Sequence, residues 1–337
     1  MAYIHVKRVG DQKYYTLRIS HRDKNGRVVT KDLENLGSDL GKVNLDHLEK
    51  KYKKEIRESY KVIKKAVESN HYLEKARAEK LRKCEFFNKD QLEEIESIKI
   101  HFNDNFLKRD KLTQKEVYSM FLIKFAVSST AIEGNTINLA QASKLLNDNI
   151  LPKDKTLREV YDLQNTQKVF FELLGSIPTI SHETIQKVHD ELLNNIDARK
   201  RYRTHDIHII GQPFKPSPAR YVKADMDLLL KWYRENENRI HPLALAIFFH
   251  HKFENIHPFS DGNGRTGRML MNLILLSKMY PPLIVPKTLR EKYLQVMNEA
   301  DKGLEKDLFS TGIKYYSELL TFISIEFKKT YWNTFLI

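Results

Sequence analysis

Residues 257–268 (HPFSDGNGRTGR) place one histidine, one aspartate, three glycines and two arginines in a short stretch with apolar helical patterns on both sides. We expect the glycines to let the backbone turn so that successive N–H groups converge. Residues 266–279 then carry apolar side chains at helical spacing, so these N–H groups would lie at a helix N-terminus, which binds anions. Arg265 and Arg268, three residues apart, would project to one side of the first turn and donate to phosphate oxygens. The stretch predicts a polyphosphate site.

Two common phosphate motifs do not fit this stretch. Residues 262–267 formally satisfy G-x-G-x-x-G, but that fingerprint needs a strand before it and an acidic residue about 20 positions after it. Here residues 243–256 have a helical pattern, and a lysine and a threonine stand where the acid is expected. The glycines also have P-loop spacing, yet an arginine and a methionine replace the required Lys-Ser/Thr. We therefore expect neither an ordinary dinucleotide site nor a P-loop.

His257 and Asp261 supply the remaining chemistry. An imidazole that titrates near neutrality can take a proton from a hydroxyl group at physiological pH. A carboxylate four residues later suits Mg²⁺, which needs few protein oxygens when phosphates supply the others. Base, metal ligand and anion site together predict phosphoryl or nucleotidyl transfer. The alternative is an ordinary turn after a helix, with solvated arginines.

The same twelve positions resemble the signature His-Pro-Phe-x-Asp/Glu-Gly-Asn-Gly-Arg-x-x-Arg of Fic-domain proteins, and the similarity extends over about residues 118–303. Most members of that family are protein adenylyltransferases, which move AMP from ATP to a Ser, Thr or Tyr hydroxyl of a target protein. The resemblance implies a mainly α-helical Fic-type bundle with a flap β-hairpin, and ATP and Mg²⁺ as cofactors. It implies these roles: His257 as the base, Asp261 as the Mg²⁺ ligand, Gly262, Asn263, Gly264 and Arg265 around the α- and β-phosphates, and Arg268 on the γ-phosphate.

A second motif lies upstream, where residues 129–134 (STAIEG) match Ser/Thr-x-x-x-Glu-Gly/Asn. This is the inhibitory motif of many Fic proteins, and its position resembles the class with an N-terminal inhibitory helix. We expect an inhibitory helix over about residues 116–134. Ser129 is the first residue of the motif, and Glu133 would lie at the end of the helix. The Glu133 carboxylate would pair with Arg268 and keep its guanidinium from the γ-phosphate. The alternative is a surface carboxylate at the end of a helix.

The resemblance also implies a flap over the site. Residues 201–211 alternate like a short strand before three prolines. In the family, this region is a β-hairpin that holds the target segment by strand addition. The residues implied in the flap are Ile207, His208, Ile209, Ile210 and Gly211. We expect His205 and His208 to be surface residues, because alternate positions on a strand place them away from Asp261.

The C-terminal part follows the predicted phosphate site. Residues 288–300 predict a helix that resembles the family's adenine pocket, with Tyr293 and Asp301 as candidate contacts. A tyrosine packed in the core is the alternative for Tyr293. Residues 306–337 predict a terminal helix, and no helix-turn-helix DNA-binding module follows.

The N-terminal part has a different composition. Residues 1–41 predict a small three-stranded β meander, with D-K-N-G at 23–26 as a hairpin signal. Residues 42–83 hold 14 Lys/Arg against 7 Asp/Glu, a local balance of +7, and apolar residues at every third or fourth position predict an amphipathic helix with a basic outer face. We therefore expect a β meander at 1–41, a basic helical segment at 42–113 and a Fic domain at 114–337.

The composition of the chain indicates its class and its expected location in the cell. Of the 337 residues, 41% are hydrophobic and 30% charged, a balance typical of globular proteins, and the longest apolar run is too short to span a membrane. The N-terminus does not look like a signal peptide, and a lone cysteine, Cys84, excludes an internal disulfide. We therefore predict a cytoplasmic protein without membrane contacts. The net charge of +13 favours anionic partners, but no nucleic-acid-reading module accompanies it.

The sequence as a whole predicts an autoinhibited, Mg²⁺- and ATP-dependent protein adenylyltransferase that acts on a target protein and on itself. One alternative is that the same site also removes AMP, with Glu133 positioning a water molecule. The other is a basic, nucleic-acid-binding regulator with a catalytically vestigial Fic domain. The sequence leaves open the target, the acceptor residue, formation of a homodimer, the signal that relieves inhibition and the role of the meander.

Overall fold

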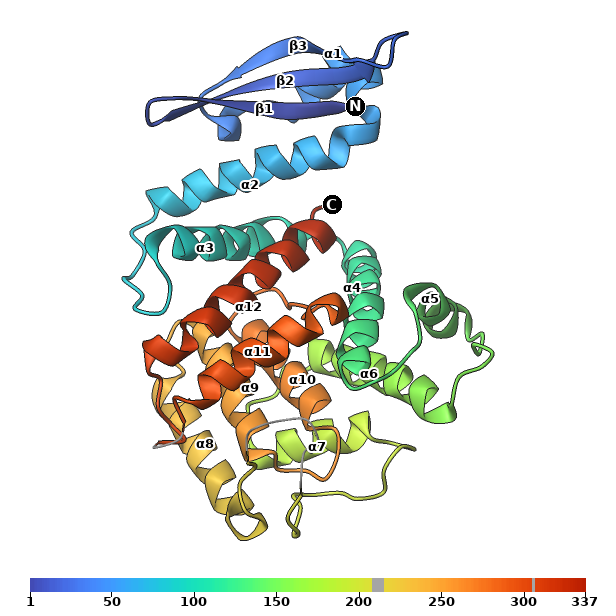
Figure 1. Cartoon of the computed structure of the whole chain (residues 1–337), viewed down its shortest axis with the longest axis vertical. Coiled ribbons are helices and arrows are strands. Elements are labelled where there is room, and N and C mark those ends of the chain that lie inside the picture. The colour runs from blue at the N-terminus through green and yellow to red at the C-terminus, as the bar shows by residue number, and fades with distance from the viewer. Residues whose placement is uncertain (208–214, 305–306) are drawn as a thin grey trace. The chain divides into compact units, whose positions relative to one another are not determined.

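The computed structural model describes residues 1–207, 215–304 and 307–337. The chain divides into two compact units: one holds residues 1–83 and 89–104, and the other holds 84–88 and 105–335. Figure 1 shows the order of the elements along the chain. The described residues are mostly helical and contain a small antiparallel sheet, which confirms the predicted fold class.

The N-terminal unit contains the predicted meander. Its strands are β1 (Ala2–Val9), β2 (Gln12–Arg22) and β3 (Val28–Gly37), paired antiparallel in the order β1-β2-β3. The predicted turn before β3 is held by Asp23, whose carboxylate accepts from the backbone N–H of Asn25 and Arg27. Such side-chain to backbone bonds are the reason that aspartate favours tight turns.

The helices of this unit are α1 (Leu45–Ile56), α2 (Tyr60–Ala78) and α3 (Lys89–Asp104), with 3₁₀ turns at η1 (Leu40–Lys42) and η2 (Arg57–Ser59). The prediction of one continuous amphipathic helix after the meander is therefore wrong. Leu48 from α1 and Ile63 from α2 both enter the core formed with Leu17 of β2. A break between the two helices lets both contribute apolar side chains to that one core.

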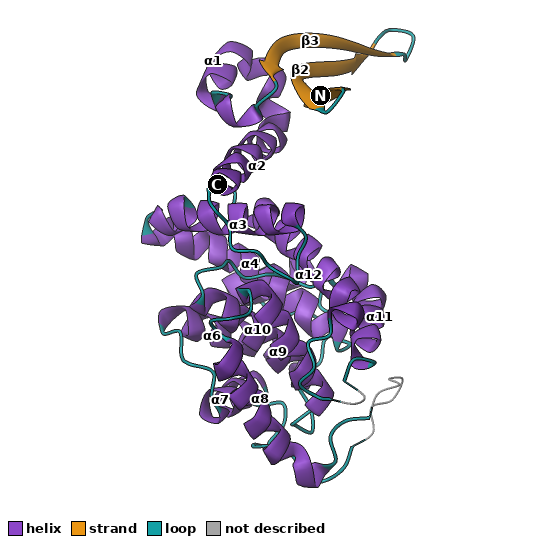
Figure 2. Ribbon diagram, turned by 90° about the vertical axis from the view of Figure 1, so that its left-hand side faces the viewer, coloured by secondary structure: helices purple, strands orange, loops and turns teal. Residues whose placement is uncertain are grey.

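The second unit is helical in its described residues, whereas the strands of Figure 2 belong to the N-terminal unit. Its helices are α4 (Lys111–Ile132), α5 (Leu139–Asp148), α6 (Leu157–Gly175), α7 (His182–Leu192), α8 (Val222–Asn236), α9 (Pro242–Ile256), α10 (Asn263–Ser277), α11 (Arg290–Asp301) and α12 (Ile313–Thr334). Short 3₁₀ turns are η3 (Phe106–Lys108), η4 (Ala219–Tyr221) and η5 (Lys287–Leu289). No helix in the described ranges is both long and apolar enough to cross a bilayer.

Helices α9 and α10 form the centre of this unit. They pack against each other, α9 also contacts α8, α11 and α12, and α10 also contacts α4, α6 and α7. Most residues of both helices are buried, including every residue of α10 except the last. The loop between them contains His257 and Asp261, so the predicted site is mounted on the most enclosed part of the fold.

Helix boundaries follow local capping signals. Ser181 is the N-cap of α7 and accepts a hydrogen bond from the backbone N–H of Thr184. Asp110 likewise accepts from the backbone N–H of Thr113 at the start of α4. Reciprocal capping boxes begin α5 and α6. The capping box of α6 fixes the start of that helix, where Arg158 pairs with Asp261 of the loop.

An aromatic cluster anchors α4, the helix that ends at Glu133. Phe335 lies after α12 and packs against Phe106, Tyr118 and Phe121, at ring-centroid distances of 5.0, 5.8 and 5.7 Å. Phe335, Phe106 and Phe121 are each 0% exposed. The cluster therefore joins two helices that are more than a hundred residues apart in the chain.

Phe335→Ala is expected to lower the free energy of unfolding by about 3–5 kcal/mol, because it removes a buried ring and leaves a cavity. Ile325→Ala on α12 is the matched control, since Ile325 is 42% exposed and its loss should cost within about 0.5 kcal/mol. Denaturant unfolding measures both. Equal losses in the two variants would contradict the anchoring role of Phe335.

Candidate active site

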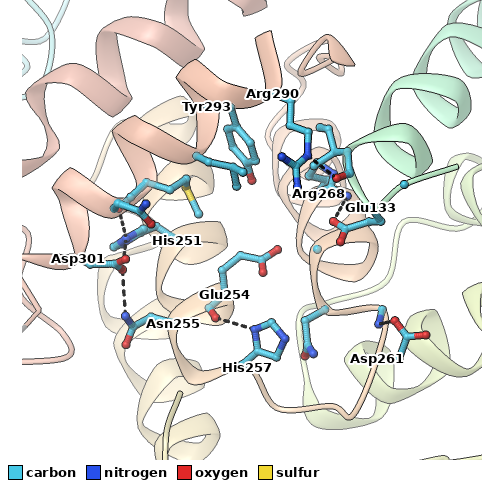
Figure 3. A pocket seen from close by; sticks show the side chains of 18 of the residues that line it. Glu133, His251, Glu254, Asn255, His257, Asp261, Arg268, Arg290, Tyr293 and Asp301 are labelled. Carbon is cyan, nitrogen blue, oxygen red and sulfur yellow. Dashed lines mark hydrogen bonds and ion pairs between the residues drawn. The ribbon is translucent and has the colours of Figure 1, made fainter. Parts of the chain in front are cut away.

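A pocket with a cavity volume of about 450 Å³ lies at the end of α4, between the loop 257–262 and α11 (Figure 3). It is lined by most of the residues that the sequence predicted for the site: Glu133, His257, Asp261, Gly262, Asn263, Gly264, Arg268, Tyr293 and Asp301. Ser129, Arg265 and Ile207 do not line it. The structure therefore brings three distant segments of the chain together around one cavity.

His257 occupies the left-handed C-cap of α9, with φ of 53° and ψ of 61°. Its Nδ1 lies 3.2 Å from the carbonyl oxygen of Glu254. Because a carbonyl only accepts, Nδ1 carries the proton in this arrangement and the lone pair is on Nε2. Burial lowers the pKa of His257 to about 4, so the imidazole is neutral at pH 7. A neutral imidazole with its lone pair on Nε2 is able to act as a proton acceptor.

Asp261 follows His257 in the loop and is surrounded by donors. Its Oδ1 accepts from the backbone N–H of Gly262 at 2.6 Å and from Arg265 Nη2 at 3.2 Å, and its Oδ2 pairs with Arg158. Burial alone would raise the pKa of this carboxyl, but the two guanidinium groups hold it below its ordinary value. Asp261 is therefore an ionised carboxylate that lines the cavity.

The three glycines do not all serve the turn, which corrects the prediction from the sequence. Gly262 alone has the left-handed conformation, with φ of 76°, and is the N-cap of α10. Gly264 and Gly267 are helical residues that permit close approach. A Cβ at Gly264 would overlap the Glu133 carboxylate, and one at Gly267 would lie 2.7 Å from His250 Nδ1. The helix thus starts at Asn263, earlier than predicted, and Gly264 leaves one position of its first turn without a side chain.

Arg265 and Arg268 diverge, so the prediction that both project to one side is wrong. Arg265 is buried and pairs with Asp162 of α6 as well as with Asp261. Arg268 is also buried but faces α4. Each long side chain turns to an acidic partner on a different neighbouring helix, because a buried charge needs a counter-charge. Of these two arginines, Arg268 lines the cavity in this conformation and Arg265 does not.

Arg268 is held by the end of α4. Its Nη2 donates to Glu133 Oε1 at 2.8 Å and to the Ser129 carbonyl at 2.8 Å, and its Nε donates to Ser129 Oγ at 3.0 Å. The Glu133 carboxylate raises the pKa of Arg268 against the opposing effect of burial. The predicted Glu133–Arg268 ion pair is thus present (Figure 3). Ser129, at the start of the motif, contacts the same guanidinium.

Backbone geometry keeps Glu133 in this place. Glu133 is the C-cap of α4, and Gly134 follows with φ of 105°, a conformation that glycine adopts without strain. Arg290 of α11 donates through Nε to the carbonyl oxygen of Ile132 at 2.8 Å, which satisfies one of the last carbonyl groups of α4. Arg290 also lines the cavity.

Several residues around the site were not predicted from the sequence. Arg158 and Asp162 lie one turn apart on α6, and each contacts a residue about a hundred positions away. Arg203 donates to the carbonyl oxygens of His257 at 2.8 Å, His205 at 3.1 Å and Ser217. It therefore ties both ends of the predicted flap segment to the backbone of His257. Helical spacing could have paired Arg158 with Asp162, but nothing in the sequence indicated their distant partners.

The predicted adenine contacts line the cavity but also serve the core. Tyr293 is buried and its hydroxyl lies 2.5 Å from His250 Nε2. Asp301 Oδ1 lies 3.0 Å from both His251 Nε2 and Asn255 Nδ2. Of the predicted flap residues, Ile207 is described without regular structure, and residues 208–211 lie outside the described ranges. His205 is exposed, as predicted.

Asn263 closes the loop that carries the site. Its side-chain amide donates to the carbonyl oxygen of Phe259 at 2.8 Å, and its Oδ1 accepts from the Phe259 backbone N–H at 2.9 Å. Asn263 is 2% exposed. Since both side-chain bonds go to the loop backbone, the loop fixes the orientation of the Asn263 amide in this conformation.

Comparisons with known proteins point to one family. Residues 179–275 match the model of the Fic/DOC family. The protein adenylyltransferase Fic of Drosophila melanogaster is 31% identical over 214 residues, which are 60% of this chain and 41% of the relative. That of Aedes aegypti is 33% identical over 205 residues, 57% of this chain and 39% of the relative. The chain thus spans about two fifths of the length of these relatives.

Solved structures share the fold. A Fic-domain-containing signaling protein from Bacteroides thetaiotaomicron has a TM-score of 0.64 at 19% identity, covering 72% of this chain and 94% of that one. Residues 134–508 of Fic-1 from C. elegans give a TM-score of 0.61 at 24% identity, covering 73% of this chain and 71% of that one. At these identities the likeness establishes the architecture alone.

Asn263→Ala is expected to lower the free energy of unfolding by about 2–5 kcal/mol, because it leaves two buried backbone groups of Phe259 without partners. Ser260→Ala in the same loop is the control, since Ser260 is partly exposed and should change stability by about 0.5 kcal/mol or less. Denaturant unfolding of the full chain measures the difference. An Asn263→Ala variant as stable as the control would contradict the loop-closing role.

Proposed function

Since this chain contains a Fic domain of the Fic/DOC family, we propose that it is a protein adenylyltransferase, which transfers AMP from ATP to a Ser, Thr or Tyr hydroxyl of a target protein. The observation that carries the proposal is the position of His257, a neutral imidazole beside the N-terminus of α10 in one cavity. A base next to an anion site is the arrangement that nucleotidyl transfer requires.

The residues would divide the work as follows. The first N–H groups of α10 have no partner within the helix and would bind phosphate oxygens, with Gly262 and Gly264 allowing close approach. His257 Nε2 would take the proton of the target hydroxyl while the hydroxyl oxygen attacks the α-phosphorus of ATP. A new P–O bond forms to the target, the bond to the bridging oxygen breaks, and pyrophosphate leaves. Positioning and charge stabilisation dominate the rate of such transfers.

Asp261 fits a magnesium ligand. Its carboxylate is ionised, lines the cavity and is 29% exposed. Among the described residues no group of three or more His, Cys, Asp or Glu side chains could hold a metal, so the protein would supply few ligands. This suits Mg²⁺, which takes one or two carboxylates and fills its shell with phosphates and water. When bound, Mg²⁺ would neutralise charge on the phosphates.

The same proposal includes autoinhibition by Glu133. While its carboxylate holds Arg268 at 2.8 Å, a γ-phosphate would have to displace that carboxylate to take its place on Nη2 of the guanidinium. ATP would then bind with its terminal phosphate displaced, and the α-phosphorus would be out of line for attack. Labelling of the chain by itself would provide an assay that does not require the target protein.

His257→Ala is expected to lower incorporation of AMP from ATP by about 10²–10⁴-fold, the usual effect of losing a general base, while ATP still binds through backbone N–H groups. Mass spectrometry of the chain incubated with ATP and Mg²⁺ detects the added AMP, and calorimetry measures ATP binding. His21→Ala is the control because His21 is exposed on β2. Near-normal labelling by His257→Ala would refute the assigned role.

Glu133→Gly is expected to raise self-labelling by about 5–150-fold, the range of coupling between competing ligands, because it frees Arg268. Arg268→Ala should lower labelling by about 10²-fold, and Glu133→Gly should not rescue it, since the guanidinium is then gone. Labelling with ATP radioactive in its α-phosphate measures each rate. If folded Glu133→Gly, checked by circular dichroism, labels no faster than the parent chain, the autoinhibition model fails.

A further inference from the structure

Glu254 is a carboxyl group in the cavity that the reaction described above does not use. It lies on α9 one turn before His257, and its backbone carbonyl oxygen lies 3.2 Å from His257 Nδ1. Its side chain lines the cavity and points between His257 and the Arg268–Glu133 pair (Figure 3). Its Oε1 is buried and has no hydrogen-bond partner among the described residues. A buried polar atom without a partner is costly, so its presence at a binding site calls for a ligand.

Gly267 makes room for this carboxyl. A Cβ at Gly267 would lie 3.0 Å from Glu254 Oε1, closer than ordinary van der Waals contact. The bare surface of α10 therefore lets the carboxyl lie in the depth of the pocket, one helical turn from the Gly264 position where phosphates would meet the helix. Arg268 is the residue after Gly267 in α10. Its Nε and Nη2 donate to Glu133 and Ser129 rather than to Glu254.

The surroundings favour the neutral form of Glu254. Burial raises the pKa of Glu254 to about 8, and the carboxylates of Glu133 and Asp301 act in the same direction against Arg268. At neutral pH the side chain is then a carboxylic acid, which has a proton to donate, whereas an ionised carboxylate only accepts. An acid can donate to a phosphate oxygen, and its ionised form would repel the same phosphate.

We propose that Glu254 binds the nucleotide as a neutral carboxylic acid, donating a hydrogen bond to a phosphate oxygen on the Arg268 side of the pocket. This inference rests on the proposed function, because it takes the occupant of the pocket to be ATP. It makes Glu254 a positioning residue whose protonation is linked to nucleotide binding. Affinity for ATP should fall as pH rises through the pKa of this group, since the ionised form must first take up a proton.

Other groups that face Glu254 do not share this behaviour. On α9, burial lowers the pKa of His257 to about 4 and that of His250 well below its ordinary value, so both are neutral above pH 7. On α11, burial raises the pKa of Tyr293, and the Asp301 carboxylate is held by His251 and Asn255. On α10, the pKa of Arg268 is raised. Arg290 of α11 and Asp261 of the loop line the same cavity, and Glu133 of α4 also faces it but is removed in the experiment.

The test compares Glu133→Gly with the double variant Glu133→Gly/Glu254→Gln, because Gln is neutral at every pH and keeps a donor of similar size. The dissociation constant for Mg·ATP is measured by calorimetry at pH 7 and pH 9, where the terminal phosphate, with a last pKa near about 6, is ionised throughout. Glu133→Gly should bind about 10–100-fold more weakly at pH 9, because burial still raises the pKa of Glu254 but the loss of the Glu133 charge moves it down toward pH 7, whereas the double variant should lose this pH dependence. The ratio between the two pH values is the readout.

A second measurement does not depend on folding of the double variant. Calorimetry of Glu133→Gly at pH 9 in two buffers of different ionisation enthalpy reports proton uptake, expected at about one proton for each ATP bound. Uptake near zero, or the same pH ratio in a folded double variant, would overturn the role of Glu254 while leaving ATP binding intact. Absence of ATP binding at both pH values would overturn the proposed function, and this inference with it.

Discussion

The guanidinium of Arg268 is the group on which the arrangement of the site depends. It is buried in α10, and its donors go to the Ser129 hydroxyl, the Ser129 carbonyl and the Glu133 carboxylate of α4. A buried cation that loses its counter-charge costs several kcal/mol, so this guanidinium must always have an anionic partner. The end of α4 is the partner in this structure. The aromatic cluster around Phe335 packs against Tyr118 and Phe121 in the first half of the same helix.

In the proposed function, that requirement makes inhibition a competition between two anions. Removing Glu133 without a replacement would leave Arg268 uncompensated, whereas a phosphate group can supply the charge that the carboxylate supplied. Arg290 fixes the last turn of α4, so the carboxylate does not simply swing away at no cost. Within the proposed function, the balance between the two anions therefore depends on how firmly α4 is held as well as on affinity for ATP.

Local signals made much of this predictable from the sequence. The core stretch at 257–268 and the β meander follow from residue type and spacing, and the resemblance to Fic-domain proteins implies the Glu133–Arg268 pair. What could not be predicted depends on partners far away in the chain. Arg265 faces α6 because Asp162 is there, and two of the three glycines serve approach by neighbouring side chains rather than a turn. Sequence spacing fixes a direction on a helix, but only the packed neighbours decide what lies in that direction.

Gly264 connects these observations. It lies in the first turn of α10, where the backbone N–H groups have no acceptor within the helix. A Cβ at this position would overlap Glu133 Oε1 and lie 2.9 Å from Arg268 Nη1. The Glu133 carboxylate therefore lies against the same bare helix start that the proposal assigns to phosphates. A carboxylate at this place is attracted by the partial positive charge of the helix end as well as by Arg268. Glu133 thus occupies the space, the cation and the helix terminus together, which is why one side chain at the end of α4 is sufficient to control the pocket in the proposed mechanism.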